Sequence, residues 1–248
     1  MNRVEPLSAF SPRQREILAL TERNGFVTIE SLAEEFGVSA QTIRRDIIAL
    51  ADAGRLQRFH GGAGVTGQTE TLRLDHGQKE QLSVEDKVRV AQTAAACVPD
   101  GASLFLDVGT TVEMAAKALN ARPGFRVFTN SMRAALAFDP SRHDVNVIGR
   151  RVAGRDGSLV GEETMLALQG LRLDYALIGC SAVDAEGRVM DYDLSKIAVK
   201  KVAMQAARKS LLLATASKFG RSALSTIAML SDFEQLIDGR QDLAAEAG

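Results

Sequence analysis

Hydrophobic residues recur at helical spacing in three short segments near the start of the chain. The first begins at Ser11–Gln14, where a serine cap, a proline and a glutamine three residues after the cap are typical of a helix start. A second helix is predicted over about Thr28–Phe36, because a glycine follows it. In the third, Ile43, Ile47 and Leu50 lie on one face. The pattern therefore predicts three short helices.

The predicted second and third helices are separated by a tight turn that contains a glycine, which is typical of a helix-turn-helix. Ser39 is the expected cap of the third helix. Residues 56–63 then predict a short strand and a glycine-rich tip, as in a winged variant. The arginine pair of the third helix, taken alone, is more typical of a solvated face, but the whole arrangement favours DNA binding. Its exposed face carries side chains suited to base edges and phosphates, namely Gln41, Thr42, Arg44 and Arg45.

From residue 83 onward, short hydrophobic runs alternate with helical segments. This order indicates an α/β domain with a mostly parallel sheet covered on both faces, whose ligand lies at the carboxyl ends of the strands. The strands are predicted at Leu104–Asp107, Arg126–Thr129, Val145–Ile148, Leu173–Ile178 and Leu211–Ala214. The helices are predicted at Ser83–Cys97 (capped by Ser83), Val112–Leu119, Met132–Phe138, Thr164–Gln169 and Leu194–Lys209.

Polar residues follow the predicted strands. Asp107 ends the first strand, and Gly109, Thr110 and Thr111 come next, at a helix start where free N–H groups and hydroxyls suit a phosphate. Ordinary helix capping explains this junction equally well. Other strand ends are similar, however, and four of them on one sheet edge favour a site for a small polyhydroxylated anion. The further residues at these ends include Thr129, Asn130, Ser181 and Lys218.

Two groups of cations near this edge have two interpretations each. Lys218 either supplies the countercharge for the anion or is a solvated surface lysine. The basic loop with Arg150, Arg151 and Arg155 either closes over the ligand or is simply exposed. The segment Thr66–Gln81 is polar, and we predict a DNA-binding domain at residues 1–65, a linker at 66–82 and an effector domain at 83–248.

Composition and charge narrow the class of protein. Hydrophobic residues make up 46% and charged residues 25% of the 248 residues, as in an ordinary globular protein. No hydrophobic run reaches the roughly 18 residues of a membrane span, and the first ten residues do not have the pattern of a secretory signal. The two cysteines and three histidines are too few and too scattered for a disulfide framework or a zinc site. We therefore expect a cytoplasmic protein without a metal or a cofactor.

The net charge of −1 averages over an uneven distribution. All eight cations among the first 66 residues are arginines, and eight acids balance them. Between Ser39 and His60, however, four arginines are accompanied by only two acids. Because arginine binds guanine edges and phosphates with two parallel hydrogen bonds, this local excess agrees with DNA binding.

Two stretches of the first domain resemble the DeoR family of bacterial transcription regulators. They are Val38–Asp46, which reads VSAQTIRRD, and Arg58–Ala63, which reads RFHGGA. The resemblance implies a winged helix-turn-helix whose recognition helix begins near Ser39 and whose wing brings Arg58 and His60 near the DNA backbone. The DNA-binding residues it implies are Ser39, Gln41, Thr42, Arg44, Arg45, Arg58 and His60.

The second domain also resembles this family, so that the likeness extends from about Ser11 to Asp238. It implies a sensor domain similar in fold to ribose-5-phosphate isomerase, in regulators that mostly repress carbohydrate operons and are released by a phosphorylated sugar or polyol. Asp191–Asp193 and Phe219–Arg221 are similar to stretches of the members that repress glycerol-3-phosphate regulons. The stretches that carry the resemblance are Asp107–Thr111, Thr129–Asn130, Asp156–Gly161 and Ser217–Gly220.

Three positions depart from the family pattern. Thr215 stands where an acid usually precedes the Ser-Lys pair, Ser195–Ala198 replaces a stretch that usually contains acids, and Arg150 replaces the second glycine of a pair. These differences leave open which ligand hydroxyls are bound. The effector-binding residues that we predict are Asp107, Gly109, Thr110, Thr111, Thr129, Asn130, Ser181 and Lys218.

The leading hypothesis is a repressor that binds double-stranded operator DNA as a homodimer or homotetramer, because paired reading heads match a two-fold operator. A phosphorylated sugar or polyol would release it. An active sugar-phosphate isomerase or deaminase fused to a DNA-binding segment is an alternative, since related folds catalyse such reactions. A transcription activator is a second alternative, because sequence does not set the sign of regulation.

Overall fold

The computed structural model describes residues 10–24, 26–59, 62–65, 83–153 and 156–239. The predicted linker, His60 and Arg155 lie outside these residues. Within the described ranges, the buried hydrophobic side chains of residues 10–63 form one cluster, and those of residues 90–237 form three others. No cluster takes residues from both parts, so each part of the chain has its own core.

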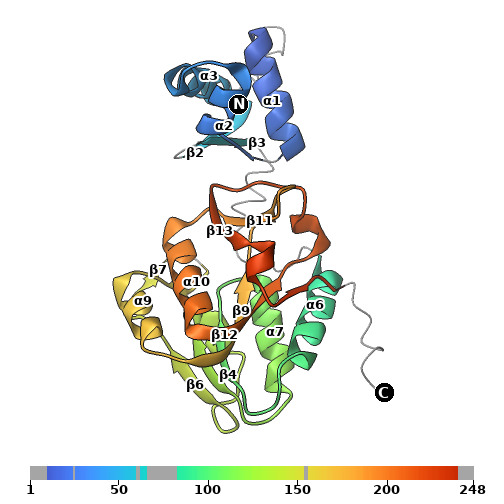
Figure 1. The fold of residues 1–248 in the computed structure, drawn as a ribbon, viewed down its shortest axis with the longest axis vertical. Helices are drawn as coiled ribbons and strands as arrows, with labels where there is room; N and C mark the ends of the chain where they lie inside the picture. Colours follow the sequence, from blue (N-terminus) through green and yellow to red (C-terminus); the bar gives the residue numbers. More distant parts are fainter. Residues whose placement is uncertain (1–9, 25, 60–61, 66–82, 154–155, 240–248) are drawn as a thin grey trace.

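The first part consists of three helices and a small antiparallel sheet (Figure 1). Its strands pair in the order β1-β3-β2. The predicted helices and hairpin are confirmed, whereas β1 was not predicted, because it has only three residues and pairs with β3 from a distance in the sequence. The elements are α1 (Pro12–Asn24), β1 (Phe26–Thr28), α2 (Ile29–Phe36), α3 (Ala40–Asp52), β2 (Leu56–Phe59) and β3 (Gly62–Val65).

Local capping fixes where these helices begin and end. Ser11 and Gln14 form the predicted reciprocal pair, since the Gln14 N–H donates to Ser11 Oγ (3.2 Å) and the Ser11 N–H donates to Gln14 Oε1 (3.0 Å). Gly37, with a φ of 62°, ends α2 in the left-handed conformation that favours glycine. Ser39 Oγ accepts from the Thr42 N–H (3.2 Å) and caps α3 as predicted.

The second part is built around a six-stranded parallel sheet with the strand order β14-β12-β9-β4-β5-β6. Its strands are β4 (Ser103–Leu106), β5 (Arg126–Thr129), β6 (Asp144–Val147), β9 (Leu173–Gly179), β12 (Ala207–Leu213) and β14 (Gln235–Ile237). Its helices are α6 (Val84–Ala96), α7 (Thr110–Asn120), α8 (Met132–Ala135), α9 (Glu162–Gln169) and α10 (Leu194–Ala206), and two short 3-10 turns are Ala216–Lys218 and Leu230–Asp232.

Helices cover both faces of this sheet, as predicted. Along β4 the side chains alternate between the two faces, because Leu104 and Leu106 join a cluster with α6 and α7, whereas Phe105 joins one with α9 and α10. Figure 1 shows these two pairs of helices on opposite sides of the strands. No helix within the described residues is both long and hydrophobic enough to span a bilayer.

Segments that follow the parallel strands in sequence form two smaller sheets. Strands β7 (Val152–Ala153) and β8 (Ser158–Leu159) form a hairpin. Strands β10 (Ala182–Val183), β11 (Arg188–Asp191) and β13 (Ser225–Met229) form an antiparallel sheet. None of these five strands was predicted, because each is short and lies in a segment without a clear alternation of hydrophobic residues.

Three local predictions for this part were wrong. The helix predicted to end at Lys209 ends at Ala206, and β12 begins at Ala207, because the chain there pairs with β9 rather than continuing the helix. The helix predicted over Met132–Phe138 ends at Ala135. Ser83 precedes α6 with a φ of 51° and makes no side-chain cap to a described residue, so this helix begins without the predicted serine cap.

Candidate functional site

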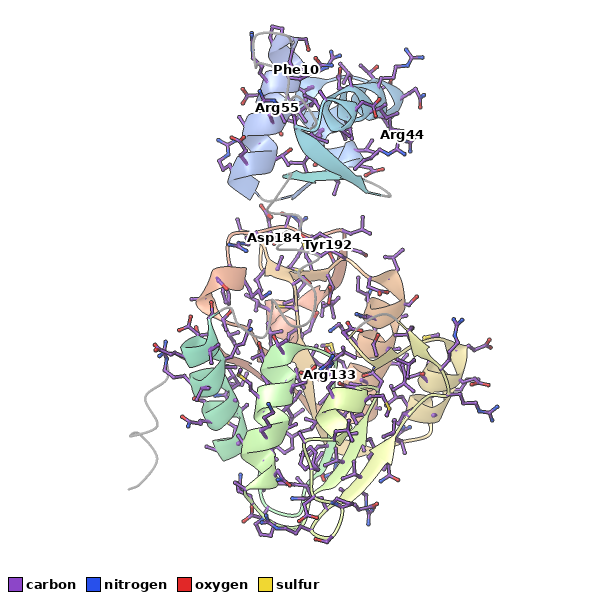
Figure 2. All side chains as sticks on the ribbon, turned by 180° about the vertical axis from the view of Figure 1, so that it is seen from behind. Phe10, Arg44, Arg55, Arg133, Asp184 and Tyr192 are labelled. Atoms are coloured by element: carbon purple, nitrogen blue, oxygen red, sulfur yellow. The ribbon has the colours of Figure 1, made fainter. Side chains whose placement is uncertain are left out.

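The outer face of α3 carries the side chains predicted to contact DNA. Gln41, Arg44 and Arg45 are exposed, and Ile48 continues the same face with 39% of its surface exposed. The opposite face is buried in the core through Ile43, Ile47 and Leu50. Figure 2 shows Arg44 on the outer side of the helix. The sequence therefore folds into a helix with one face free to enter a DNA groove.

The structure describes three of the other residues predicted to contact DNA, namely Ser39, Thr42 and Arg58. Ser39 and Thr42 bind each other, because their hydroxyl oxygens lie 2.9 Å apart in the cap of α3. Arg58 is exposed on β2, in the hairpin predicted as the wing. His60 lies outside the described residues. The structure thus brings Gln41, Thr42 and the two helix arginines together on one helix, with Arg58 on the hairpin that follows it.

The second candidate site lies at the carboxyl edge of the parallel sheet, where β4 leads into α7. Gly109 has a φ of 141°, a backbone conformation that side chains disfavour, and it stands directly before the first turn of α7. Gly109 has no side chain with which to cap this helix, and the first N–H groups of the helix point out of its end. Thr110 is buried and Thr111 is partly exposed. An uncapped helix N-terminus attracts anions through these N–H groups and the helix dipole.

Asp107 lies immediately before this turn and takes part in a buried ion network. Its Oδ2 contacts Lys200 Nζ and accepts from the Gly179 N–H (3.0 Å). Lys200 Nζ also donates to the Gly179 carbonyl oxygen (2.9 Å) and lies 3.5 Å from Asp191 Oδ2. The Asp107 and Lys200 side chains are only 1% and 2% exposed. Asp107 Oδ1 is buried and has no hydrogen-bond partner among the described residues.

The buried charges in this network shift each other's protonation. Burial raises the pKa of Asp107 above its ordinary value, and the Lys200 ammonium opposes that rise. Burial alone would lower the pKa of Lys200, but the carboxylates of Asp107 and Asp191 outweigh burial and raise it. Lys200 therefore stays charged, which the two carboxylates require.

Lys200 is the main site residue that sequence reasoning missed. A signal was present, because Lys200 stands three residues from Ile197 and three from Ala203, which both belong to the buried face of α10. A lysine on a buried helix face needs an acidic partner. Asp107, at the end of a hydrophobic strand, and Asp191 were acids that the sequence had already pointed to.

Thr129 and Asn130 lie at the end of β5, beside Asp107 on the same sheet edge, and both are fully buried. Their polar groups bind mainly within the protein. Thr129 Oγ1 donates to the Leu106 carbonyl (2.6 Å), and Asn130 Nδ2 donates to the Leu159 carbonyl of β8 (3.0 Å). Asn130 Oδ1 is left without a partner among the described residues. These two residues therefore fix the sheet edge, and one acceptor remains unpaired.

Ser181 and Lys218 complete the predicted set. Ser181 Oγ donates to Asp191 Oδ1 (2.7 Å), which joins this serine to the Lys200 network. Lys218 is partly exposed, at the end of a short 3-10 turn, and its charge acts on the thiol of Cys180 next to Ser181. Burial nevertheless raises the pKa of Cys180 to about 12. Lys218 is thus a cation near the end of β9, as the countercharge hypothesis requires.

The departures from the family pattern also have structural partners. Lys196, in the stretch that lacks acids, pairs with Asp156 in the β7–β8 hairpin. Arg150 lies 3.4 Å from Glu163, and both side chains are strongly exposed. Arg151 is exposed as well. The Lys196 pair therefore ties the hairpin to the start of α10, whereas Arg150 makes only a surface pair, which contributes little to stability.

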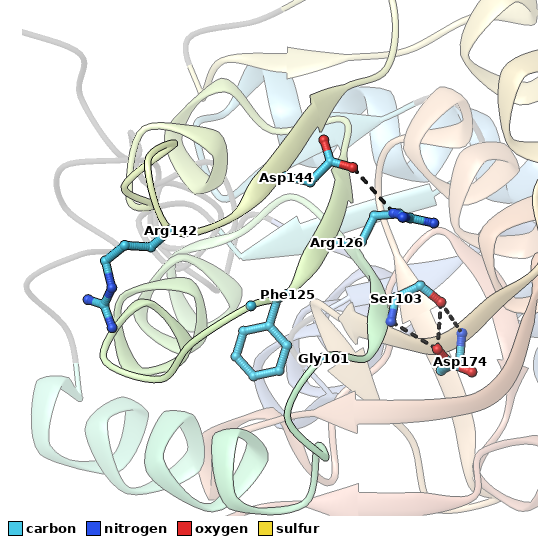
Figure 3. A pocket seen from close by; sticks show the side chains of 8 residues that line it. Gly101, Ser103, Phe125, Arg126, Arg142, Asp144 and Asp174 are labelled. Atoms are coloured by element: carbon cyan, nitrogen blue, oxygen red, sulfur yellow. Dashed lines mark hydrogen bonds and ion pairs between the residues drawn. The ribbon is translucent and has the colours of Figure 1, made fainter.

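A hollow of about 320 Å³ lies at the opposite edge of the sheet, where the strands begin (Figure 3). Several of its polar groups already bind each other. Asp174 accepts from the Ser103 N–H (2.9 Å) and hydroxyl (2.6 Å), and Arg126 Nε lies 3.3 Å from Asp144 Oδ2. Parallel sheets bind ligands at their carboxyl edge. The edge with Asp107 and α7 is therefore the better candidate for a ligand site.

Comparison with known protein families decides the class of the chain. Residues 82–240 match the DeoR C-terminal sensor domain, and residues 13–69 match the DeoR-like helix-turn-helix domain. The chain belongs to the DeoR family. The recognition made from the sequence motifs is therefore confirmed, and the two cores of this DeoR protein correspond to a helix-turn-helix part and a sensor part.

The relatives of this DeoR protein include named repressors. The glycerol-3-phosphate regulon repressor of Haemophilus influenzae is 37% identical over 230 residues, covering 92% of this chain and 89% of the relative. The protein of the same name from Escherichia coli is 33% identical over 221 residues, covering 88% and 86%. Among solved structures, ribose 5-phosphate isomerase A from Methanocaldococcus jannaschii matches with a TM-score of 0.40 and 17% identity over 54% of each chain.

Proposed function

We propose that this DeoR-family protein is a transcription repressor whose operator binding is released by a phosphorylated sugar or polyol. The observation that carries the proposal is the presence, in one chain, of both a DeoR-like helix-turn-helix and a DeoR sensor domain. Similarity to glycerol-3-phosphate regulon repressors supports repression and favours a three-carbon polyol phosphate as the effector. We place the DNA-binding domain at residues 1–65, the linker at 66–82 and the effector domain at 83–248.

The DNA contacts in this proposal come from α3 and the wing. Gln41, Arg44 and Arg45 read base edges or bind phosphates from the exposed face of α3, beside Ser39 and Thr42 at its start. Arg58 and His60 bind the backbone from the wing. Exposure and the arginine content of this face support these roles.

Alanine substitution tests these contacts. Arg44→Ala or Arg45→Ala should cost about 1–3 kcal/mol of operator binding if the side chain reads a base, with little loss on unrelated DNA. If the side chain binds phosphate, the slope of log affinity against log salt should fall by about one. Lys201→Ala, on an exposed position of α10, is the matched control. Unchanged affinity and salt slope in both arginine variants would refute the assignment.

In the effector domain, we place the phosphate at the start of α7. The N–H groups after Gly109 and the hydroxyls of Thr110 and Thr111 donate to it, and Lys218 supplies the countercharge. The uncapped N-terminus of α7 supports this placement. The hydroxyl end of the effector lies toward the β5 and β9 strand ends, with Thr129, Asn130 and Ser181.

The orphaned acceptors support this orientation. Asp107 Oδ1 and Asn130 Oδ1 are fixed acceptors without described partners, because the other polar atom of each side chain is already bound. A hydroxyl of the effector can donate a hydrogen bond to such an acceptor, whereas a phosphate dianion has no proton to donate and is repelled. We therefore expect the hydroxyls of the effector, and not its phosphate, to face Asp107 Oδ1 and Asn130 Oδ1.

A ligand series tests this orientation without DNA, by the thermal shift of the protein. Glycerol 3-phosphate should stabilise the protein at concentrations at which propyl phosphate, of the same length but without hydroxyls, does not. The affinities should differ by at least about tenfold, since the acceptors stay unpaired with propyl phosphate. Equal shifts from both compounds, or from inorganic phosphate, would contradict the assignment of the hydroxyl end.

Two alternatives from the sequence have simple tests. Named relatives that are repressors favour regulation over catalysis, and turnover of a sugar phosphate by the pure protein would reverse this choice. A promoter-reporter assay in a deletion strain separates a repressor from an activator. We also propose a homodimer or homotetramer, which light scattering of the free and DNA-bound protein tests directly.

A further inference from the structure

Asp46 is an acidic residue directly after the two exposed arginines of α3, yet it faces the other way. It is buried, with 7% of its surface exposed. Both of its carboxylate oxygens bind α1. Arg13 Nε donates to Oδ2 (2.6 Å), and Gln14 Nε2 donates to Oδ1 (3.2 Å). A carboxylate held by one bond at each oxygen is fixed in direction as well as in distance.

The Gln14 end of this arrangement is itself fixed by the helix cap. Gln14 Oε1 accepts from the Ser11 N–H (3.0 Å), while its Nε2 donates to Asp46. One amide side chain therefore serves both the cap of α1 and the carboxylate of α3. We call Ser11, Arg13, Gln14 and Asp46 the Asp46 clamp.

Hydrophobic packing alone sets the position of α3 less strictly. Ile43, Ile47 and Leu50 bury α3 against the core, but contacts of this kind are non-directional and tolerate small rotations of the helix about its axis. The Asp46 clamp acts at the side of this stripe, one residue beyond Arg45. A rotation that moved the arginines would therefore have to break at least one bond of the clamp.

We infer that Arg13 and Gln14 are positioning residues, which hold α3 through Asp46 so that its exposed face meets DNA in one orientation. The inference rests on the proposed DNA contacts of α3. It assigns Arg13 a role without direct DNA contact, although Arg13 is an arginine in a DNA-binding domain. A phosphate contact by Arg13 is the competing role, and the two roles predict different salt dependence.

The experiment uses the full chain and two duplexes. One is a sequence selected by the unaltered protein from a random pool, and the other is its scrambled version. Arg13→Gln and Asp46→Asn remove the ion pair but keep similar side-chain shapes. Arg15→Gln, at an exposed position of the same helix, is the matched control for loss of an arginine. Affinity for both duplexes is measured by fluorescence anisotropy at several salt concentrations.

If the inference is right, Arg13→Gln and Asp46→Asn each lower affinity for the selected duplex by at least about tenfold. Affinity for the scrambled duplex and the salt slope stay as in the unaltered protein, because no phosphate contact is lost. The double variant loses no more than the weaker-binding single variant, since both changes break the same pair. Arg15→Gln leaves the ratio of the two affinities unchanged.

Other results overturn the inference. Equal loss on both duplexes with a salt slope lowered by about one makes Arg13 a phosphate contact. An unchanged ratio in both variants shows that the clamp does not position α3. Circular dichroism checks that the variants fold; if Asp46→Asn does not, Arg13→Gln decides alone, because it leaves Gln14 bound to the carboxylate. A wild-type protein that selects no sequence would refute the proposed function itself, before the clamp is considered.

Discussion

Replacing Lys200 with methionine would remove the only described cation from a buried cluster of two carboxylates. Methionine keeps the length and flexibility of the lysine side chain but cannot donate to Asp107 Oδ2 or to the Gly179 carbonyl. The substitution therefore changes charge and hydrogen bonding with little change in volume. Asp107, with a side chain only 1% exposed, is left without its counterion.

The expected cost follows from the burial of this pair. Breaking a buried ion pair by removing one partner costs about 3–5 kcal/mol, because the remaining charge stays in a medium of low polarity. For a domain of this size, that loss lowers the melting temperature by roughly 6–20 °C. The Asp191 side chain is 15% exposed, so water partly solvates its charge and the loss of Lys200 destabilises it less. The double variant with Asp107→Leu should recover much of the stability, because it also removes the unpaired charge.

Differential scanning calorimetry of the full chain is a suitable assay, since the chain contains no tryptophan to report unfolding by fluorescence. Lys201→Met, on an exposed position beside Lys200, is the matched control and should leave the transition unchanged. The affinity of the DNA-binding domain for DNA should also stay unchanged without effector. A loss below about 1 kcal/mol in Lys200→Met, or a double variant worse than the single one, would refute the account of the buried network.

Three further predictions concern other parts of the second domain. A Cβ at Gly149, where φ is 114°, would lie 2.7 Å from two side-chain atoms. Gly149→Ala should therefore lower the free energy of unfolding, measured by urea denaturation, by at least about 2 kcal/mol. The loss should exceed that of Gly101→Ala, because a Cβ at Gly101 meets no atom within 4 Å. Cys180 is partly exposed, but its pKa is raised to about 12, so it should react more slowly with an alkylating reagent at pH 8 in the folded protein than in the denatured protein. Hydrogen bonds from Ser103 lower the pKa of Asp174 in the folded protein. The ionised Asp174 therefore stabilises the fold at pH values above its ordinary pKa of 3.8, and this stabilisation is lost as the pH falls through the lower pKa of the folded state. Ser103→Ala should accordingly cost about 1 kcal/mol at pH 7 and less near pH 2, and an equal cost at both would contradict this reasoning.

The DNA-binding part of the fold was the more predictable, because its signals are local. Serine caps, Gly37 and the stripe of Ile43, Ile47 and Leu50 act within a few residues of chain, and the structure has the three helices where these signals place them. The strand β1 was missed because its pairing partner lies more than thirty residues away in the sequence. Non-local pairing leaves no mark in such a short segment.

The candidate effector site was predictable in place but not in its internal bonds. Strand ends that carry polar residues do converge on one sheet edge, because parallel strands end together. Which side chains are already bound there depends on the tertiary structure. Asn130 binds the hairpin strand β8, and Lys200 reaches Asp107 from a helix almost a hundred residues later. Neither contact follows from spacing along the chain.

In the proposed function, a phosphorylated sugar or polyol releases this protein from specific DNA. The most direct test is fluorescence anisotropy on DNA from just upstream of its own operon, at fixed salt, titrated with sugar and polyol phosphates that include glycerol 3-phosphate. We predict specific binding that one of these phosphates releases, while inorganic phosphate at the same concentration does not. Specific binding that no phosphate changes would contradict the proposed effector and its site at the start of α7.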